Sequence, residues 1–356
     1  MNEDCLKLTI YFGERDRANG VFLADALLDL FGEHGFQTSV LLRGAEGFGA
    51  KQRLQTQRLL TLSEDLPVVA LAVDTRERIE RALPEVTALT GDGLVTLERA
   101  RMLTGEIGAT ALADEATKLT VYCGRQERAG GRPAFLAVVD LLHRRGIAGA
   151  TVLLGVDGTA HGERRRARFF GRNDDVPLMV ISVGDGERVA SVLPELSELL
   201  ERPLLTLERL RVCKRDGRLL RVPHELPASD PAGLGLWHKL MVYTSEQARH
   251  GRHPLHVELI RRLRAEGAPG ATALRGVWGF HGEHVPHGDR LLSLRRHVPV
   301  VTVLVDTPER SARWFELVDE LTATSGLVTS EVVPAARATG PELLSGGLKL
   351  AERIAG

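Results

Sequence analysis

The sequence predicts an α+β protein made of three similar domains in one chain, because the chain repeats itself. One segment is written three times, starting at Lys7, Lys118 and Lys239. Each copy also ends in a similar tripeptide: Thr96-Leu97-Glu98, Thr206-Leu207-Glu208 and Thr329-Ser330-Glu331. The first and third copies stay in register, at a constant offset of 232 residues, from Lys7 and Lys239 through Asp74 and Asp306. A threefold repeat of one globular unit is typical of a pseudo-trimer folded into a single polypeptide.

Composition and charge narrow the class of protein. Lys and Arg number 46 against 47 for Asp and Glu, so nothing predicts a nucleic-acid binder. The longest apolar runs, such as 68–73, have strand length and are too short to span a membrane. The polar start at 1–4 does not resemble a signal peptide. Cys5, Cys123 and Cys213 show no metal or redox spacing, which predicts free thiols and a cytoplasmic protein.

The first unit shows the order of elements most clearly. Its predicted elements are a strand at 6–12, a helix at 22–31, a strand at 37–42, a polar excursion at 44–57, a strand at 68–73, a helix at 75–89 and a strand at 94–101. Pro84 falls inside the second helix and predicts a kink or a helix start. The order βαββαβ is the ferredoxin-like arrangement, with both helices on one face of the sheet. Neighbouring copies can cover the other face.

The repeats divide the chain into three domains and a tail. These lie at 5–102, 116–213, 237–334 and 335–356, and the second domain is the most divergent. The segment at 213–236 is rich in Pro, Gly and charge, which is typical of a linker, and a second linker is expected at 103–117. The end of the tail, 341–356, predicts a short amphipathic helix.

Two stretches of the first unit, Leu41–Gly49 and Leu62–Val69, resemble the PII-like proteins catalogued as domain of unknown function 190. The resemblance covers unit one almost whole, most of unit three, and unit two more loosely. It implies a ferredoxin-like fold, a trimer of the PII type, and small effectors such as adenine nucleotides bound in clefts between subunits. Family members are often encoded beside fluoride-exporting channels, so it also implies a membrane transporter or channel as partner.

The loop after the second strand is the candidate ligand site. Glycines let backbone N–H groups approach an anion closely, a neighbouring arginine supplies charge, and an aromatic ring can stack on a base. The candidate residues are Arg43, Gly44, Glu46, Gly47, Phe48, Gly49, Arg275, Gly276, Trp278, Gly279 and Phe280. The alternative is structural: the glycines form a strand-end turn, and the two phenylalanines belong to the core.

Unit two departs from this pattern. Leu154 replaces Arg43, Thr159 replaces Phe48, and Arg164-Arg165-Arg166 follows in the loop. The three clefts should therefore differ in ligand affinity, and we expect the cleft marked by Leu154 to bind ligand most weakly.

Histidines gather in unit three, at His281, His284 and His287. Their spacing can bind a transition metal if the segment turns helically, and CutA-type relatives of PII are associated with metals. Gly282 and Pro286 break such a helix, so we expect no tight metal site.

The sequence as a whole favours a cytoplasmic, non-enzymatic regulator. It would bind a small anionic effector, an adenine nucleotide, in its inter-domain clefts. Occupancy would order the loops near 43–58 and 275–290 and so control a partner protein. Two alternatives remain open at this point: a metal-responsive protein of the CutA kind, and a ligand-free scaffold.

Overall fold

The computed structural model describes most of the chain as a mixed α+β protein. The described residues are 2–49, 52, 55–56, 66–108, 112, 116–160, 163–166, 176–223, 225–227, 229, 233–281, 286–288, 298–338, 344–345 and 348. Within them the chain forms six α-helices, and every strand pair between named strands is antiparallel. The three repeats expected from the sequence are present.

Each repeat uses the same six long elements. In the first unit they are β1 (Asn2–Gly13), α1 (Leu23–Glu33), β4 (Thr38–Arg43), β7 (Pro67–Thr75), α2 (Arg76–Thr90) and β8 (Leu94–Thr104). The strand order in the sheet is β4-β7-β1-β8. The first strand is thus central, and its register pairs Lys7 with Val73 on one side and with Glu98 on the other.

The second and third units repeat this plan. The second unit has β9 (Ala116–Gly124), α3 (Ala134–Arg144), β12 (Gly149–Leu154), β15 (Pro177–Asp185), α4 (Gly186–Leu199) and β16 (Leu204–Arg209). The third has β19 (Trp237–Ser245), α5 (Leu255–Ala265), β22 (Ala271–Arg275), β25 (Pro299–Asp306), α6 (Pro308–Leu321) and β26 (Leu327–Val333). Their strand orders are β12-β15-β9-β16 and β22-β25-β19-β26.

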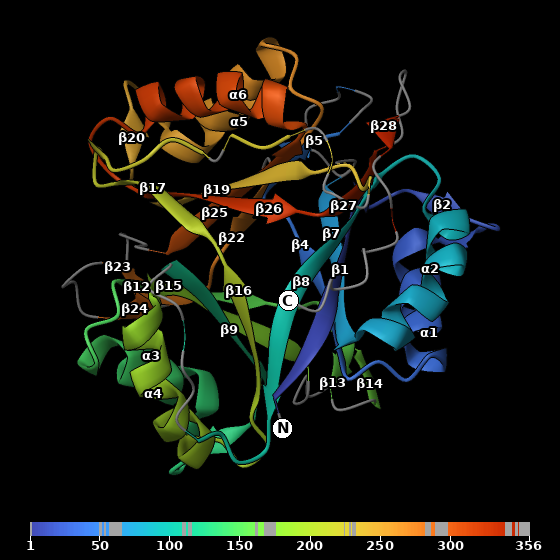
Figure 1. Ribbon diagram of the computed structural model, residues 1–356, viewed down its shortest axis with the longest axis vertical. Coiled ribbons are helices and arrows are strands. Elements are labelled where there is room, and N and C mark those ends of the chain that lie inside the picture. The colour runs from blue at the N-terminus through green and yellow to red at the C-terminus, as the bar shows by residue number, and fades with distance from the viewer. Residues whose placement is uncertain are drawn as a thin grey trace.

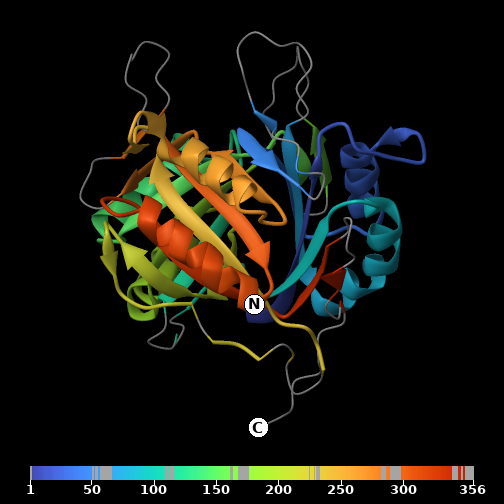
Figure 2. The ribbon, with the colours of Figure 1, turned by 90° about the horizontal axis from the view of Figure 1, so that it is seen from above.

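Apolar residues alternate along the strands and recur at helical spacing in the helices, and together they form one core in each unit. In unit one Leu8 and Ile10 of β1 pack with Leu27 of α1 and Ile79 of α2, all fully buried. The helix pairs therefore cover the outer faces of the sheets, and Figures 1 and 2 show them on the outside with the strands between them. Pro84 lies inside the continuous helix α2, so a helix start at this position is wrong.

A short strand after the second strand of each unit pairs with the second strand of a neighbouring unit. Strand β5 (Glu46–Phe48) of unit one pairs with β22 of unit three. Strand β13 (Asp157–Ala160) of unit two pairs with β4 of unit one. Strand β23 (Trp278–His281) of unit three pairs with β12 of unit two. The three additions close a cycle, and we call each of these contacts a seam.

The end of each unit adds to the fourth strand of the next unit. The end of β8 pairs with β16 of unit two, and β17 (Arg211–Arg215) pairs with β26 of unit three. Strand β27 (Ala335–Ala338) then pairs with β8 of unit one. The first part of the expected linker at 213–236 is therefore strand. In the tail, β28 (Leu344–Ser345) is strand where a helix was expected, and the tail's other residues in 341–356 apart from Leu348 lie outside the described residues.

The inner faces of the sheets meet one another. One apolar cluster joins Leu71 and Val73 of unit one to Tyr122, Met179 and Ile181 of unit two. Smaller clusters join units three and one, and units two and three. The face of each sheet away from its helices is thus covered by a neighbouring unit, as expected from the repeat.

Candidate functional sites at the centre and at the seams

Six charged side chains meet at the centre of the molecule, and we call them the central ring. Each unit contributes a lysine from its first strand and a glutamate from its fourth, in the pairs Lys7 and Glu98, Lys118 and Glu208, and Lys239 and Glu331. Within each pair the two residues are register partners on neighbouring strands. All six are buried, with no more than 6% of any residue exposed.

Every lysine of the central ring bridges two units. Within units, Nζ lies 2.7 Å from Oε2 for Lys7 and Glu98, 3.0 Å for Lys118 and Glu208, and 2.8 Å for Lys239 and Glu331. Between units, Lys118 reaches Glu331 at 2.6 Å, Lys239 reaches Glu98 at 2.5 Å, and Lys7 contacts Glu208. The contacts close into a ring of three positive and three negative charges in alternation.

Burial makes each charge of the central ring depend on its neighbours. Burial alone disfavours a carboxylate, yet the ammonium groups of Lys239 and Lys7 hold the pKa of Glu98 well below its usual value. Burial also opposes the charge of Glu331, but neighbouring lysines lower its pKa to about 2. In the same way burial disfavours the charge of Lys7, while the surrounding glutamates raise its pKa well above the usual value. At Lys118 burial outweighs the glutamates, and the pKa is lowered.

The ring glutamates raise the question of a metal. In the part of the chain that the structure describes, they are the one group of three or more His, Cys, Asp or Glu side chains whose ligand atoms converge, all within 4.8 Å of one another. Each carboxylate already bonds the ammonium groups of two units. The three ammonium groups already balance the three carboxylates, so a cation would add uncompensated charge to this buried ring. The donor set therefore does not fit a metal, and the ring acts as an ion-pair network.

The glycines of the predicted site lie where one unit's backbone crosses another's. A Cβ on Gly47 would lie 2.6 Å from the carbonyl oxygen of Ala271, and one on Gly279 would lie 2.2 Å from that of Ala150. Only glycine permits so close a strand contact. The N–H groups of Gly44 and Gly276 donate to proline carbonyl oxygens of their own units at 2.7 Å. These glycines thus have a structural role, and their part in anion binding stays a prediction.

The two phenylalanines of the predicted site lie in the cores of neighbouring units. Phe48 of unit one is 3% exposed and packs in the core of unit three, beside residues such as Leu259 and Phe315. Phe280 of unit three is 5% exposed, packs in the core of unit two, and meets the ring of His143 edge-on at 4.9 Å. Both rings are therefore buried in a neighbouring unit's core, as the structural alternative expects, and their part in ligand binding stays a prediction.

Both candidate arginines are paired with a glutamate of their own unit. Arg43 lies 2.7 Å from Glu14, and about half of its side chain is exposed. Arg275 is more buried and binds Glu246 with two hydrogen bonds of 3.0 Å. In unit two both charges have changed, because Leu154 stands for the arginine and Arg125 for the glutamate. The sequence prediction used the arginine alone and missed its partner.

The remaining predicted residues lie along the same seams. Glu46 begins β5 and is register partner of Ala273, whereas Gly49 follows that strand and is exposed, with open space around it. Trp278 begins β23 and packs against the core of unit two while remaining half-buried. The structure thus places the predicted site on two of the three seams.

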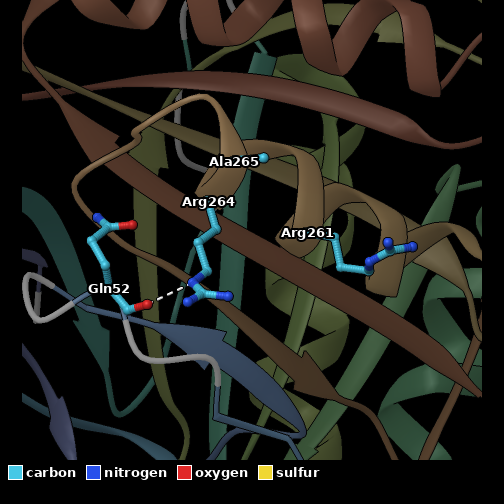
Figure 3. Close-up of a pocket in the computed structure, with 4 residues that line it drawn as sticks. All are labelled: Gln52, Arg261, Arg264 and Ala265. Carbon is cyan, nitrogen blue, oxygen red and sulfur yellow. Dashed lines mark hydrogen bonds between the residues drawn. The ribbon is translucent and has the colours of Figure 1, made fainter.

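A cavity of about 450 Å³ opens beside the seam between units one and three (Figure 3). Its walls are Gln52 from the loop of unit one and Arg261, Arg264 and Ala265 from α5 of unit three. The Arg264 Nε donates to the carbonyl oxygen of Gln52 at 2.5 Å, and the Gln52 side chain donates to the Ala268 carbonyl at 2.7 Å. Two guanidinium groups and an amide thus line one solvent-open cavity, and Arg261 also pairs with Glu258 of the same helix at 3.0 Å. The N–H groups that these contacts leave over form a donor set suited to an anion.

The helices of the other units do not repeat this charge at the matching positions. Helices α1, α3 and α5 have the same length, and the place of Arg261 is taken by Asp29 in α1 and Asp140 in α3. The place of Arg264 is taken by Gly32 and by His143, which packs on Phe280. The pair of arginines at these two helix positions is therefore particular to unit three.

The histidines of unit three are only partly described. Nε2 of His281 lies 2.7 Å from Asp216, and about half of the His281 side chain is exposed. His287 lies in the short strand β24 (His287–Gly288), and His284 lies outside the described residues. The metal prediction for this cluster stays a prediction.

The fold and the sites define a class: a three-domain α+β protein whose units exchange strands around a buried ion-pair ring. The chain belongs to the family described as DUF190, uncharacterized ACR, which matches residues 5–102, 116–212 and 237–335. A UPF0166 protein of Aquifex aeolicus is 31% identical over 91 residues, which is 26% of this chain and 86% of the relative. A UPF0166 protein of Methanocaldococcus jannaschii is 26% identical over 100 residues, 28% of this chain and 92% of that one.

These relatives match about one unit of the chain, as three repeats of one domain require. Among solved structures, aspartate kinase from Synechocystis aligns with a TM-score of 0.23 and 11% identity, covering 94% of this chain and 52% of the kinase chain. A score this low supports no shared fold. None of the helices in the described residues has the length and apolar character needed to cross a membrane.

Proposed function

We propose that the protein is a non-enzymatic, PII-like regulator that binds a small anionic effector, an adenine nucleotide, between its domains. The cavity at the seam of units one and three carries this proposal. It lies between two units, it is lined by Arg261 and Arg264, and its volume of about 450 Å³ suits a small molecule.

The arrangement of the units supports the same proposal. Each unit runs strand, helix, strand, strand, helix, strand, with its first strand in the middle of the sheet. We take each unit as a ferredoxin-like domain and the closed cycle of strand additions as a pseudo-trimer of the PII type. In such an assembly the loop after the second strand reaches a neighbour, as Gln52 reaches α5 here.

The proposed chemistry is electrostatic. The guanidinium groups of Arg261 and Arg264 would bind phosphate oxygens, and the Gln52 amide would add a neutral hydrogen bond. Ligand binding would change the Arg264–Gln52 contact and so reposition the loop of unit one, through which the protein would control a partner such as a membrane transporter or channel. Arg43 and Arg275 would assist on the adjoining strand ends.

Calorimetry with ATP, ADP and AMP tests the proposal. We expect binding by the parent protein, and a loss of about 10- to 150-fold in affinity in Arg264→Ala, since one charge-assisted contact is removed. Arg188→Ala is the matched control, because Arg188 lies on α4 of unit two and donates to a helix-end carbonyl oxygen. Absence of nucleotide binding at millimolar concentration would favour the scaffold alternative, in which the seams serve only to hold the units together.

A further inference from the structure

A second surface feature lies on the hairpin that joins units two and three. Strand β18 (Arg218–Leu219) folds back on β17, and exposed aliphatic residues follow it. Leu219, Leu220 and Val222 are 50%, 45% and 56% exposed, and they account for three of the seven large apolar side chains that the described residues expose. We call the segment 218–222 the arginine–aliphatic patch, because Arg218 and Arg221 are interleaved with these residues and are also exposed.

The backbone of the patch is fixed. The N–H groups of Leu220 and Arg221 both donate to the Cys213 carbonyl oxygen, at 2.8 and 3.0 Å, and Arg211 donates to the Val222 carbonyl at 3.1 Å. The turn before it is equally constrained, because a Cβ on Gly217 would lie 2.2 Å from a backbone oxygen of unit three. The exposed aliphatic side chains are therefore presented to solvent by an anchored hairpin.

The patch is cationic on a chain that is nearly neutral overall. Arg211 and Arg215 are half-buried beside the exposed Arg218 and Arg221. The nearest acidic residue in sequence, Asp216, is engaged with His281. The apolar residues thus sit within a group of four arginines.

We propose that the arginine–aliphatic patch docks the protein onto an anionic lipid surface. Aliphatic side chains beside arginines satisfy both parts of such an interface: the alkyl groups enter the headgroup–acyl boundary while the guanidinium groups bind lipid phosphates. An acidic protein would pair the arginines but would need a matched apolar surface for three separate side chains. A lipid surface requires no such match, and this proposal is independent of effector binding.

Co-sedimentation with vesicles tests this inference. The full-length protein should bind vesicles of phosphatidylcholine with phosphatidylserine more strongly than vesicles of phosphatidylcholine alone, and salt should weaken the binding. Arg218→Gln with Arg221→Gln should lower affinity about 30-fold, since each basic residue near an anionic surface contributes about a factor of five. Leu219→Glu with Leu220→Glu should abolish detectable binding.

The chain offers a matched control on the hairpin of β10 (Arg128–Ala129) and β11 (Arg132–Pro133) in unit two. Arg128 and Arg132 are exposed there, and within the described residues this hairpin exposes no large apolar side chain. Arg128→Gln with Arg132→Gln removes the same charge and should leave vesicle binding unchanged, and unchanged circular dichroism would show that every variant folds. Failure of the parent protein to bind anionic vesicles at low salt, or equal loss in control and patch variants, overturns the proposal. Retention on an immobilised acidic peptide without vesicle binding would overturn it in favour of a protein partner.

Discussion

The centre and the seams are built from the same threefold repeat, yet they differ in how faithfully the repeat is kept. The central ring receives one lysine and one glutamate from every unit, in the same register each time. At the seams the positions that face solvent have diverged, so that Arg261 of unit three corresponds to Asp29 and Asp140 elsewhere. Positions where all three units must meet have stayed alike, whereas positions that meet a single neighbour and solvent have specialised.

The largest effect is expected from breaking the central ring. Neutralising one ring glutamate, as in Glu208→Gln, leaves two buried ammonium groups with one carboxylate partner fewer. Removal of one partner from a buried ion pair typically costs about 3–5 kcal/mol of the free energy of unfolding. Denaturant unfolding should show this loss, and Glu98→Gln and Glu331→Gln should cost a similar amount because the three positions are equivalent. A loss below about 1 kcal/mol in all three would contradict the account of the ring.

A similar loss is expected at the seam where Phe48 enters the core of unit three. Phe48→Ala should cost about 3 kcal/mol or more, because it removes a large side chain from a packed core without a replacement. Phe22→Ala is the matched control, since Phe22 is 43% exposed and should change stability by less than about 0.5 kcal/mol. Equal losses in both variants would mean that the seam does not bury Phe48 in solution.

The sequence predicted the α+β architecture, the three repeats and their helices because these depend on local periodicity. It did not predict the central ring, although Lys7 and Glu98 both lie within the repeated segments. The available signal was a charged residue kept in all three copies of otherwise apolar strands. The ring needs the geometry of three units at once, and a repeat written along the chain does not give that geometry.

The roles of the seam residues were hidden for a related reason. Gly47 and Gly279 resemble an anion-binding loop in sequence, whereas the structure uses them where a strand crosses a neighbouring unit. Phe48 and Gln52 act on unit three, far along the chain. Partners so distant in sequence cannot be inferred from local spacing.

Acid should weaken the ring in a defined pH range. The pKa of Glu331 is lowered to about 2 in the folded protein, and that of Glu98 is also lowered. Their stabilising contribution is therefore complete above the unfolded pKa of about 4.5 and is lost as the pH falls towards 2. We expect the coupled ring carboxylates together to lose a few kcal/mol of stability over this range. Unfolding midpoints in Glu331→Gln should depend less on pH between these values than those of the parent; an unchanged slope would contradict the pKa assignment.

The seams should differ in affinity for an anion by about 1.5–3 kcal/mol per arginine. Replacing Arg261 with aspartate gives unit three the residue found in the other two units, and we expect this variant to lose nucleotide binding by at least tenfold. The reverse change, Asp29→Arg, gives the helix of unit one the charge of unit three. A gain in binding stoichiometry in that variant, measured by calorimetry, would show that the charge of this position distinguishes the seams.

The smallest effects are expected from the arginines at the strand ends, which differ between units in burial. Arg43 is about half exposed beside Glu14, and exposed pairs contribute about 0–1 kcal/mol, so Arg43→Ala should cost less than about 1 kcal/mol of stability. Arg275 is less exposed and binds Glu246 through two parallel hydrogen bonds, so its double-mutant cycle with Glu246 should give the larger coupling. Unit two provides the reference, because Leu154 and Arg125 stand in these two places and cannot form the pair. Equal coupling energies for the pairs of units one and three would mean that burial does not change the strength of the pair. The difference in anion affinity between the seams would then depend on Arg261 and Arg264.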